Sequence, residues 1–345
     1  MKWVLPLALV PAGLAAQTPP KPVPLPDFYD PPAYIVSGVT DYTNRGGHGS
    51  DAVQRSAESL TKATAAMSST KPGFATESEL RRALLQAPND AMLHRSLGDL
   101  EEQAGRAVEA LHEYQRAVEL EPNEPNLFAL ASELLKHHAP AQAADTFERG
   151  VRLFPKSSRM LLGRATATYA KGTYDQAREH FFAAVDLNPS DPEPYGFLGE
   201  VQAPEITEAD GFAVRMERFA QLHPDNAKAN YYYACILMKR DDPAARTQAQ
   251  TLLERAVRLS PSFSPPWFQL GVLFNDVHEQ GKAIQAWERA GREEAHYRLS
   301  QIYRRQGDSA RARQELEIYE RLSKQSAEQL ERERGESKRF VFENK

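Results

Sequence analysis

The chain has 345 residues, of which 41% are hydrophobic and 26% charged, and its formal net charge is −5. This apolar content is enough for a sizeable core, and the acidic balance gives no indication of nucleic-acid binding, which requires a basic surface. The single cysteine, Cys235, cannot form an internal disulfide, so an oxidising compartment would not stabilise the fold through disulfides.

Residues 1–16 have the organisation of a cleaved signal peptide. Lys2 provides a positive charge, an apolar run extends from Trp3 to Leu14, and small residues follow. This run is too short to span a bilayer. We therefore expect the mature chain to be periplasmic or secreted and to have no membrane span. The alternative is a soluble, frayed N-terminus.

Residues 17–50 are expected to form an N-terminal arm. Its first part, residues 17–33, reads QTPPKPVPLPDFYDPPA and should be extended as polyproline II. We interpret this part as a spacer. The alternative is a strand that a partner binds, with Phe28 and Tyr29 as anchors.

A glycine-rich run stands directly before the next predicted helix. It consists of Gly46, Gly47, His48, Gly49 and Ser50. Backbone amides in such a run could hold an anion, but no lysine follows in a phosphate-loop pattern. We interpret the run as a turn and helix cap, with an anion or ligand site as the alternative.

Residues 51–90 are predicted to form two helices that cap the N-terminal end of the repeats described below. The first, over residues 51–67, has one face made of Val53, Ala57, Leu60, Thr64 and Met67. The second extends from Thr76 to Ala87 and ends at Pro88, because proline lacks the amide hydrogen that a helix needs.

Prolines recur along the chain at intervals of 33 to 37 residues. They are Pro88, Pro122, Pro155, Pro189, Pro224 and Pro261. Small and large residues precede most of these prolines in one register, as Ala177, Phe181 and Ala184 precede Pro189, and their spacing places them on one helical face. Each interval therefore contains a helix that proline ends.

An earlier helix precedes each of these helices. Small residues such as Gly98, Ala165 and Gly271 let the two helices approach closely, while large residues fill the space to the next pair. The repeated unit is therefore a helical hairpin, and the sequence predicts an all-α fold.

Residues 267–287, WFQLGVLFNDVHEQGKAIQAW, resemble the tetratricopeptide repeat, and residues 91–122 do so as well. The resemblance extends over residues 91–325, as about seven units. The units start near residues 91, 124, 158, 192, 227, 264 and 293. It implies an α-solenoid, a right-handed superhelix of antiparallel hairpins. It also implies a scaffold that binds a protein or peptide partner in its concave groove, without catalysis and without a cofactor.

Residues 192–263 depart from the regular pattern, and irregular stacking is expected there. Large side chains replace small ones at Phe212 and Phe219, and Pro204 interrupts the connection in the same unit. The next unit has an enlarged turn from Arg240 to Pro243.

Two further features concern the end of the array. The junction from Ala290 to Glu293 is short and lacks proline. One long polar helix is expected from Ala310 to about Arg334, so that residues 326–345 form a helix end and tail that face water.

No sequence motif indicates catalysis or a structural metal, since HExxH, paired CxxC, GxSxG and dinucleotide patterns are missing. His137 and His138 lie in a predicted turn where adjacent side chains point apart, so no metal site is expected. Cys235 lies within an apolar helix and is interpreted as an inert thiol. The alternative function is an envelope enzyme or enzyme subunit that acts on a glycan or phosphorylated ligand through the glycine-rich run.

The family register assigns positions 2, 5, 9 and 12 of each first helix to the concave surface. Position 5 is occupied by Arg95, Phe128, Leu162, Gly196, Tyr231, Phe268 and Tyr297. Position 9 is occupied by Asp99, Ser132, Thr166, Glu200, Cys235, Val272 and Gln301. Position 9 has no asparagine and basic residues are sparse, which argues against the clamp that some family members use for a chaperone's terminal carboxylate.

The predicted groove residues are Arg95, Phe128, Tyr231, Met238, Phe268, Val272 and Tyr297. In the C-terminal half they form an apolar, aromatic stripe made of Tyr231, Met238, Phe268, Val272 and Tyr297. Such a stripe suits an amphipathic helix or an extended apolar peptide. The alternative is that these side chains pack against neighbouring helices. The binding interpretation predicts that Phe268→Ala and Tyr297→Ala weaken partner capture and leave thermal stability nearly unchanged. The sequence does not indicate an oligomeric state.

Overall fold

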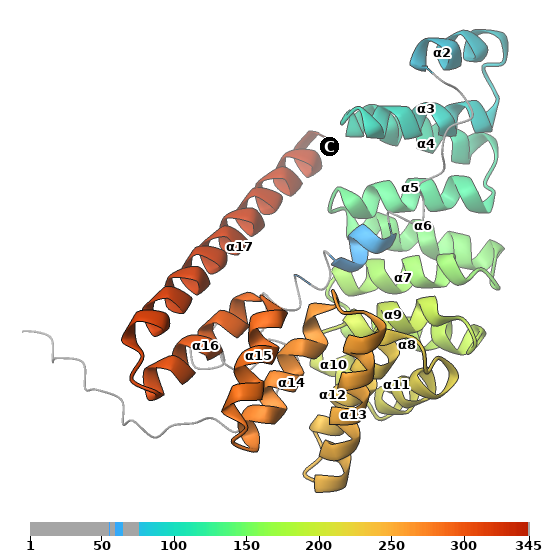
Figure 1. The fold of residues 1–345 in the computed structure, drawn as a ribbon. Helices are drawn as coiled ribbons and strands as arrows, with labels where there is room; N and C mark the ends of the chain where they lie inside the picture. Colours follow the sequence, from blue (N-terminus) through green and yellow to red (C-terminus); the bar gives the residue numbers. More distant parts are fainter. Residues whose placement is uncertain (1–54, 56–58, 65–75, 344–345) are drawn as a thin grey trace, which may run out of the picture. The chain divides into compact units, whose positions relative to one another are not determined.

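The computed structural model describes residue 55 and residues 59–64 and 76–343 (Figure 1). Its helices from residue 76 onward are α2 (Glu77–Gln86), α3 (Ala91–Gln103), α4 (Ala107–Leu120), α5 (Glu124–Lys136), α6 (Pro140–Leu153), α7 (Ser158–Ala170), α8 (Tyr174–Leu187), α9 (Pro192–Glu200), α10 (Pro204–Thr207), α11 (Asp210–Leu222), α12 (Ala227–Met238), α13 (Pro243–Leu259), α14 (Ser264–Asp276), α15 (Gln280–Ala290), α16 (Glu293–Arg305) and α17 (Ser309–Glu343). Each helix in these ranges is too short or too polar to cross a membrane.

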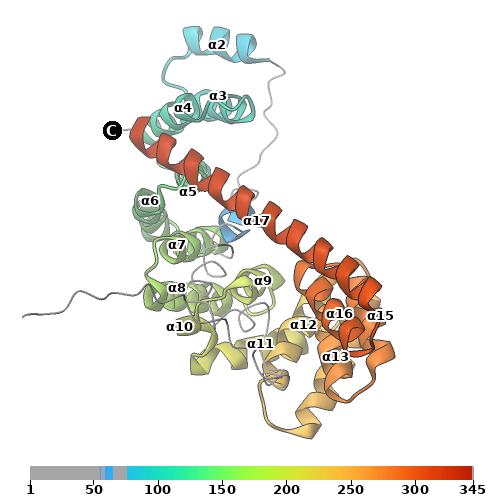
Figure 2. The same ribbon diagram turned by 90° about the vertical axis from the view of Figure 1, so that its left-hand side faces the viewer.

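The first helices of the hairpins begin where the repeat spacing predicts. They are α3, α5, α7, α9, α12, α14 and α16, and their first residues are those of the seven expected units. Each packs against the second helix of its own hairpin and against the preceding hairpin, and for α9 this second helix is α11, as Figures 1 and 2 show. The all-α, α-solenoid prediction is therefore confirmed.

Polar caps explain why these helices begin at regular positions. The side chains of five N-cap residues accept a hydrogen bond from a backbone amide in the first turn: Asp90, Asn123, Ser157, Asp191 and Asn226. Such caps satisfy amides that have no partner within the helix. The prolines end the preceding helices, so both boundaries of the connection are set locally.

Each regular hairpin turns through one left-handed residue at position 15 of its unit. Glycine occupies this position at Gly105, Gly172 and Gly307, with φ of 75°, 84° and 78°. Histidine occupies it at His138 and His278, with φ of 59° and 61°. Glycine adopts this conformation without steric cost, so three of the five turns have the residue that suits them best.

Within a hairpin, a glycine of the first helix faces a large ring of the second. A Cβ atom added at Gly98 would lie 2.7 Å from Cε1 of Tyr114, and one added at Gly271 would overlap the indole of Trp287. Each ring also donates a hydrogen bond, from Tyr114 to Asp99 over 2.9 Å and from Trp287 to the Phe268 carbonyl over 3.1 Å. The close approach and the hydrogen bond therefore both determine how the two helices of a hairpin are positioned against each other.

The helix bounds depart from the regular pattern in the units where irregular stacking is expected. In the unit that begins at Pro192, helix α9 ends at Glu200 and the short helix α10 begins at Pro204 before α11 starts. The enlarged turn separates α12 from α13, with Asp242 as N-cap. At the short junction, Gly291 adopts a left-handed conformation with φ of 56°.

Helix α17 continues beyond the predicted end at Arg334, as far as Glu343. Its first turns pack against α16, where His296 Nδ1 lies 2.7 Å from Glu315 Oε2 and the rings of Tyr297 and Tyr319 lie 5.4 Å apart. The last hairpin is therefore extended by a helix that is longer than its partner.

The segment of residues 59–64, here called the inner segment, is helical and packs against α7 (Figures 1 and 2). Leu60 is 1% exposed and belongs to the core cluster that contains Leu162 and Leu198. Thr64 Oγ1 donates a hydrogen bond to Thr166 Oγ1 over 3.2 Å. The prediction that this segment caps the end of the array is wrong for these residues, because their partners are in the third and fourth units.

Gly271→Ala tests the packing within a hairpin. The added methyl group displaces Trp287 and its hydrogen bond, so we expect the free energy of unfolding to fall by about 1–3 kcal/mol. Gly281→Ala is the matched control, because a Cβ there meets nothing within 4 Å, and it should raise stability by about 0.5 kcal/mol. Urea unfolding measures both. Equal effects of the two changes would contradict the packing argument.

Candidate functional site

The predicted aromatic stripe is mostly part of the core. Tyr231, Phe268 and Val272 are 6%, 7% and 8% exposed. The Tyr231 ring packs edge-to-face on Phe263 at 5.3 Å. Phe268 and Val272 share one core cluster, against which the partly buried Met238 also packs. These side chains are therefore engaged in packing between helices, Tyr231 in one core cluster and Phe268 and Val272 in another, which corresponds to the alternative interpretation of the stripe.

Two other predicted groove residues lie in the N-terminal half. Phe128 is 1% exposed, with its ring 5.5 Å from that of Phe147 and the Arg159 guanidinium 5.1 Å above it. Arg95 is half-buried, and its Nε atom has no hydrogen-bond partner in the described part of the chain. Phe128 is therefore a core residue.

Tyr297 is half-buried and lies against Tyr319 of α17. Cys235 is buried, as predicted, and desolvation raises the pKa of its thiol to about 12, which favours the protonated form that is a poor nucleophile. His137 Nε2 lies 3.1 Å from Glu133 Oε1, and His138 forms the adjacent turn. The run from Gly46 to Ser50 lies outside the described residues.

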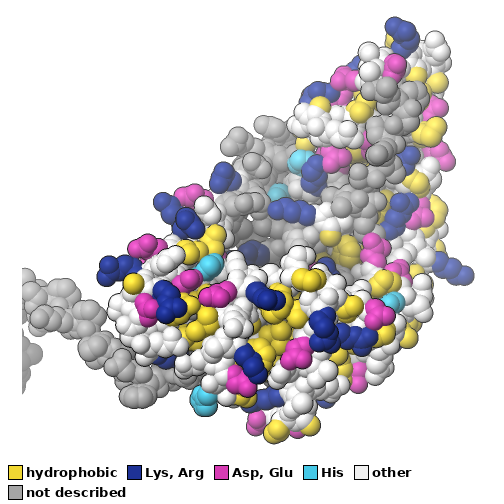
Figure 3. All heavy atoms as spheres, in the orientation of Figure 1, with side chains coloured by type: hydrophobic (Ala, Val, Ile, Leu, Met, Phe, Trp, Pro, Cys, Tyr) yellow, Lys and Arg dark blue, Asp and Glu magenta, His cyan; other side chains and the backbone are white. Residues whose placement is uncertain are grey.

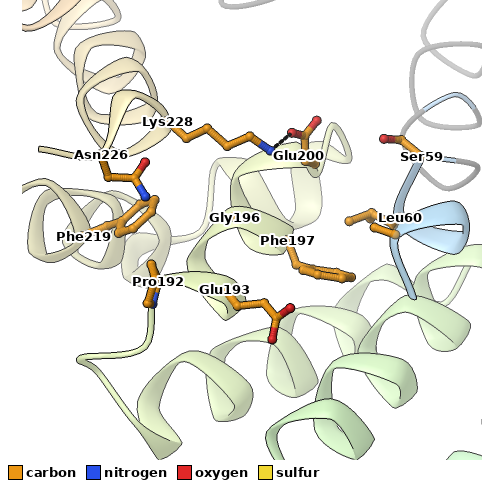
Figure 4. Close-up of a pocket in the computed structure, with 11 residues that line it drawn as sticks. Ser59, Leu60, Pro192, Glu193, Gly196, Phe197, Glu200, Phe219, Asn226 and Lys228 are labelled. Atoms are coloured by element: carbon orange, nitrogen blue, oxygen red, sulfur yellow. Dashed lines mark hydrogen bonds and ion pairs between the residues drawn. The ribbon is translucent and has the colours of Figure 1, made fainter. Parts of the chain in front are cut away.

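A pocket of about 350 Å³ opens beside the inner segment (Figure 4). Helix α9 supplies one wall through Glu193, Gly196, Phe197 and Glu200. The remaining lining comes from the inner segment, the end of α11 and the start of α12: Ser59, Leu60, Ala63, Phe219, Asn226 and Lys228, with Pro192 at the edge. In Figure 4, Leu60 and Phe197 point toward one another across one end of the pocket.

Glu193, Gly196 and Glu200 occupy positions 2, 5 and 9 of their unit. These are positions that the resemblance assigns to the concave surface, and here they share one pocket. Lys228 occupies position 2 of the next unit. The surface made by positions 2, 5, 9 and 12 of the first helices is called the inner face below. The register predicts this part of it, although the predicted stripe lies elsewhere.

The charged groups of the pocket differ in how they are paired. Lys228 Nζ lies 3.1 Å from Glu200 Oε1, and the same oxygen accepts a hydrogen bond from the Tyr232 hydroxyl over 2.9 Å. Glu193 has no cationic partner among the described residues, and desolvation together with nearby Asp191 raises the pKa of its carboxyl group. A cationic group on a partner would therefore stabilise the charged form of the Glu193 carboxylate.

Leu60, Phe197 and Lys228 were not among the predicted site residues. Position 2 of the family register would have found Lys228, whereas Leu60 is recognisable in sequence only as part of an apolar face.

Elsewhere, basic and acidic side chains are interspersed on the face drawn in Figure 3. The described residues contain no group of three or more histidine, cysteine or acidic side chains placed to hold a metal ion. The pocket offers an apolar wall, an open carboxylate and an ion pair, which suit recognition of a side chain.

Family models described as tetratricopeptide repeat match residues 77–125, 128–192 and 293–322. Among solved structures, a tetratricopeptide repeat protein from Parabacteroides merdae is similar, with a TM-score of 0.52 and 13% identity over 67% of this chain and 93% of that one. Yeast Tom70 has a TM-score of 0.50 and 17% identity over 87% of this chain and 65% of its own.

A third similar structure is YrrB, a TPR protein with an unusual peptide-binding site, with a TM-score of 0.42 and 18% identity over 55% of this chain and 97% of that one. No curated protein matches the sequence. Identities this low establish the fold alone. The family matches cover residues up to 192 and again from 293, and most of the pocket lining lies between these ranges.

Phe268→Ala and Tyr297→Ala separate core packing from partner contact. Because Phe268 is buried, its truncation should lower the free energy of unfolding by about 3–5 kcal/mol. Tyr297→Ala removes one ring contact and should cost about 1 kcal/mol. Urea unfolding of both variants measures this difference. An unchanged stability of the Phe268 variant would restore the binding interpretation of the stripe.

Proposed function

The chain belongs to the tetratricopeptide repeat family, and we propose that it is an exported, non-catalytic scaffold that binds a protein or peptide on its inner face. The observation that carries this proposal is the pocket of α9. Positions 2, 5 and 9 of one first helix line it together with Lys228 of the next unit, so neighbouring repeats contribute to one binding surface.

The chemistry of the pocket favours a peptide side chain over a reacting small molecule. Its volume of about 350 Å³ is near the lower end of ligand pockets, about 300–1,000 Å³. Phe197 provides an apolar wall, and Glu193 provides a carboxylate without a cationic partner among the described residues. A partner segment that places an apolar side chain against Phe197 and a lysine or arginine beside Glu193 would satisfy both.

Export to the periplasm or outside the cell is the second part of the proposal. Its support is the order of charge, apolar run and small residues in residues 1–16, which lie outside the described part. An exported scaffold would meet its partner among envelope proteins, so an envelope extract is the appropriate source for capture.

Glu193→Lys tests the proposed site. The affinity-tagged chain should capture a protein partner from an envelope extract, and the charge reversal should reduce capture about tenfold or more, because it replaces attraction by repulsion. Glu109→Lys on the second helix of the first hairpin is the matched control, since Glu109 is exposed and distant from the pocket lining. It should leave capture unchanged.

Mass spectrometry identifies the captured protein, and the same partner should be lost only from the Glu193 variant. Equal capture by both variants would contradict the assignment of the α9 pocket. If the folded chain captures no protein that an unfolded control fails to capture, the scaffold function itself is contradicted.

A further inference from the structure

We propose that the inner segment is a resident ligand of the binding surface, which a partner helix of the same chemistry displaces. This inference rests on the proposed function and specifies the partner. The partner is an amphipathic helix that carries a leucine, with a threonine or serine four residues later, and a basic residue that reaches Glu193.

The apolar half of the contact resembles the docking of a ligand. Leu60 is 1% exposed and lies in a core cluster whose other members are all contributed by the repeats. Leu162, at position 5 of α7, is 0% exposed, although this position faces the concave surface in the family register. Leu60 therefore occupies the place on the inner face where a partner's apolar anchor would bind.

The polar half of the contact gives specificity. Thr64 and Thr166 are each 0% exposed, and their hydroxyl groups hydrogen-bond to each other over 3.2 Å. Thr166 is at position 9 of α7, the second concave position of that helix. If an apolar group replaced one of these hydroxyls, the other would be buried without a hydrogen-bond partner, which costs free energy. This site therefore favours a ligand with a threonine or serine at this position.

The spacing of the two contacts is that of one helical face. Leu60 and Thr64 are four residues apart and both buried, so they lie on one face of the segment, whereas Lys62 and Ala63 are exposed. A short helix lying in a groove with anchors at this spacing is a known mode of peptide recognition. The inner segment thus shows which ligand geometry the face accepts.

The inner segment leaves part of the surface open, and this makes displacement favourable for a longer helix. The pocket continues from Leu60 and Ala63 past Phe197 to Glu193 and Lys228. A tethered segment has an effective concentration of about millimolar, so a competitor must make more contacts than the segment does. The open carboxylate and the exposed part of the pocket wall provide those additional contacts.

A labelled peptide with the sequence of residues 55–67, RSAESLTKATAAM, tests the inference by fluorescence anisotropy with the full chain. Leu60→Asp in the chain should release the inner segment, and the peptide should then bind about tenfold or more tightly than to the unchanged chain. Thr64→Ala is a milder second variant and should give a smaller increase. Leu85→Asp is the matched control, because Leu85 is 85% exposed on α2.

Thermal unfolding checks that each variant is folded. A peptide in which aspartate replaces the leucine should bind none of the chains. Equal binding of the unaltered peptide to the unchanged, Leu60→Asp and Thr64→Ala chains, or binding to none of them, would overturn the resident-ligand inference. That result would not affect the proposal that a partner is captured through Glu193. Conversely, if the peptide binds the Leu60→Asp chain tightly but the chain captures no partner from the extract, the proposed function is overturned and the resident-ligand inference is not.

Discussion

Close approach of two helices at a small residue is the constraint on which the hairpins depend. At Gly98 and Gly271 any side chain would overlap the ring that packs against it, so the rings of Tyr114 and Trp287 hold the two helices of their hairpins in one register. Each ring is also hydrogen-bonded to the first helix. Because a repeat contacts mainly its neighbours, this local register determines which side chains the first helices present.

The same packing decides where a partner has room to bind. In the C-terminal half it buries Tyr231, Phe268 and Val272 between helices. In the irregular unit, α9 has only nine residues, and its exposed positions line an open pocket with the start of α12. The proposed binding surface therefore includes the unit in which the helix lengths depart from the regular hairpin.

Local signals in the sequence determine what could be predicted. Prolines, polar N-caps and glycine turns act within a few residues, and polar N-caps precede five of the seven first helices, α14 and α16 being the exceptions. The burial of Phe128 and Phe268 depends on packing between helices, and periodicity alone does not distinguish an inner face from a core face. The contact of Thr64 with Thr166 joins residues 102 apart in the chain, so no local pattern indicates it. Helical periodicity predicted an apolar face that includes Leu60 and Thr64, but not the surface against which these two side chains pack.

Amide hydrogen exchange of the full chain with and without its purified partner tests the central claim, that binding takes place on the inner face of α7, α9 and α12. The account predicts slower exchange in these first helices and faster exchange in residues 59–64, because the partner replaces the inner segment. Slower exchange confined to the second helices α8, α11 and α13, with residues 59–64 unchanged, would contradict it.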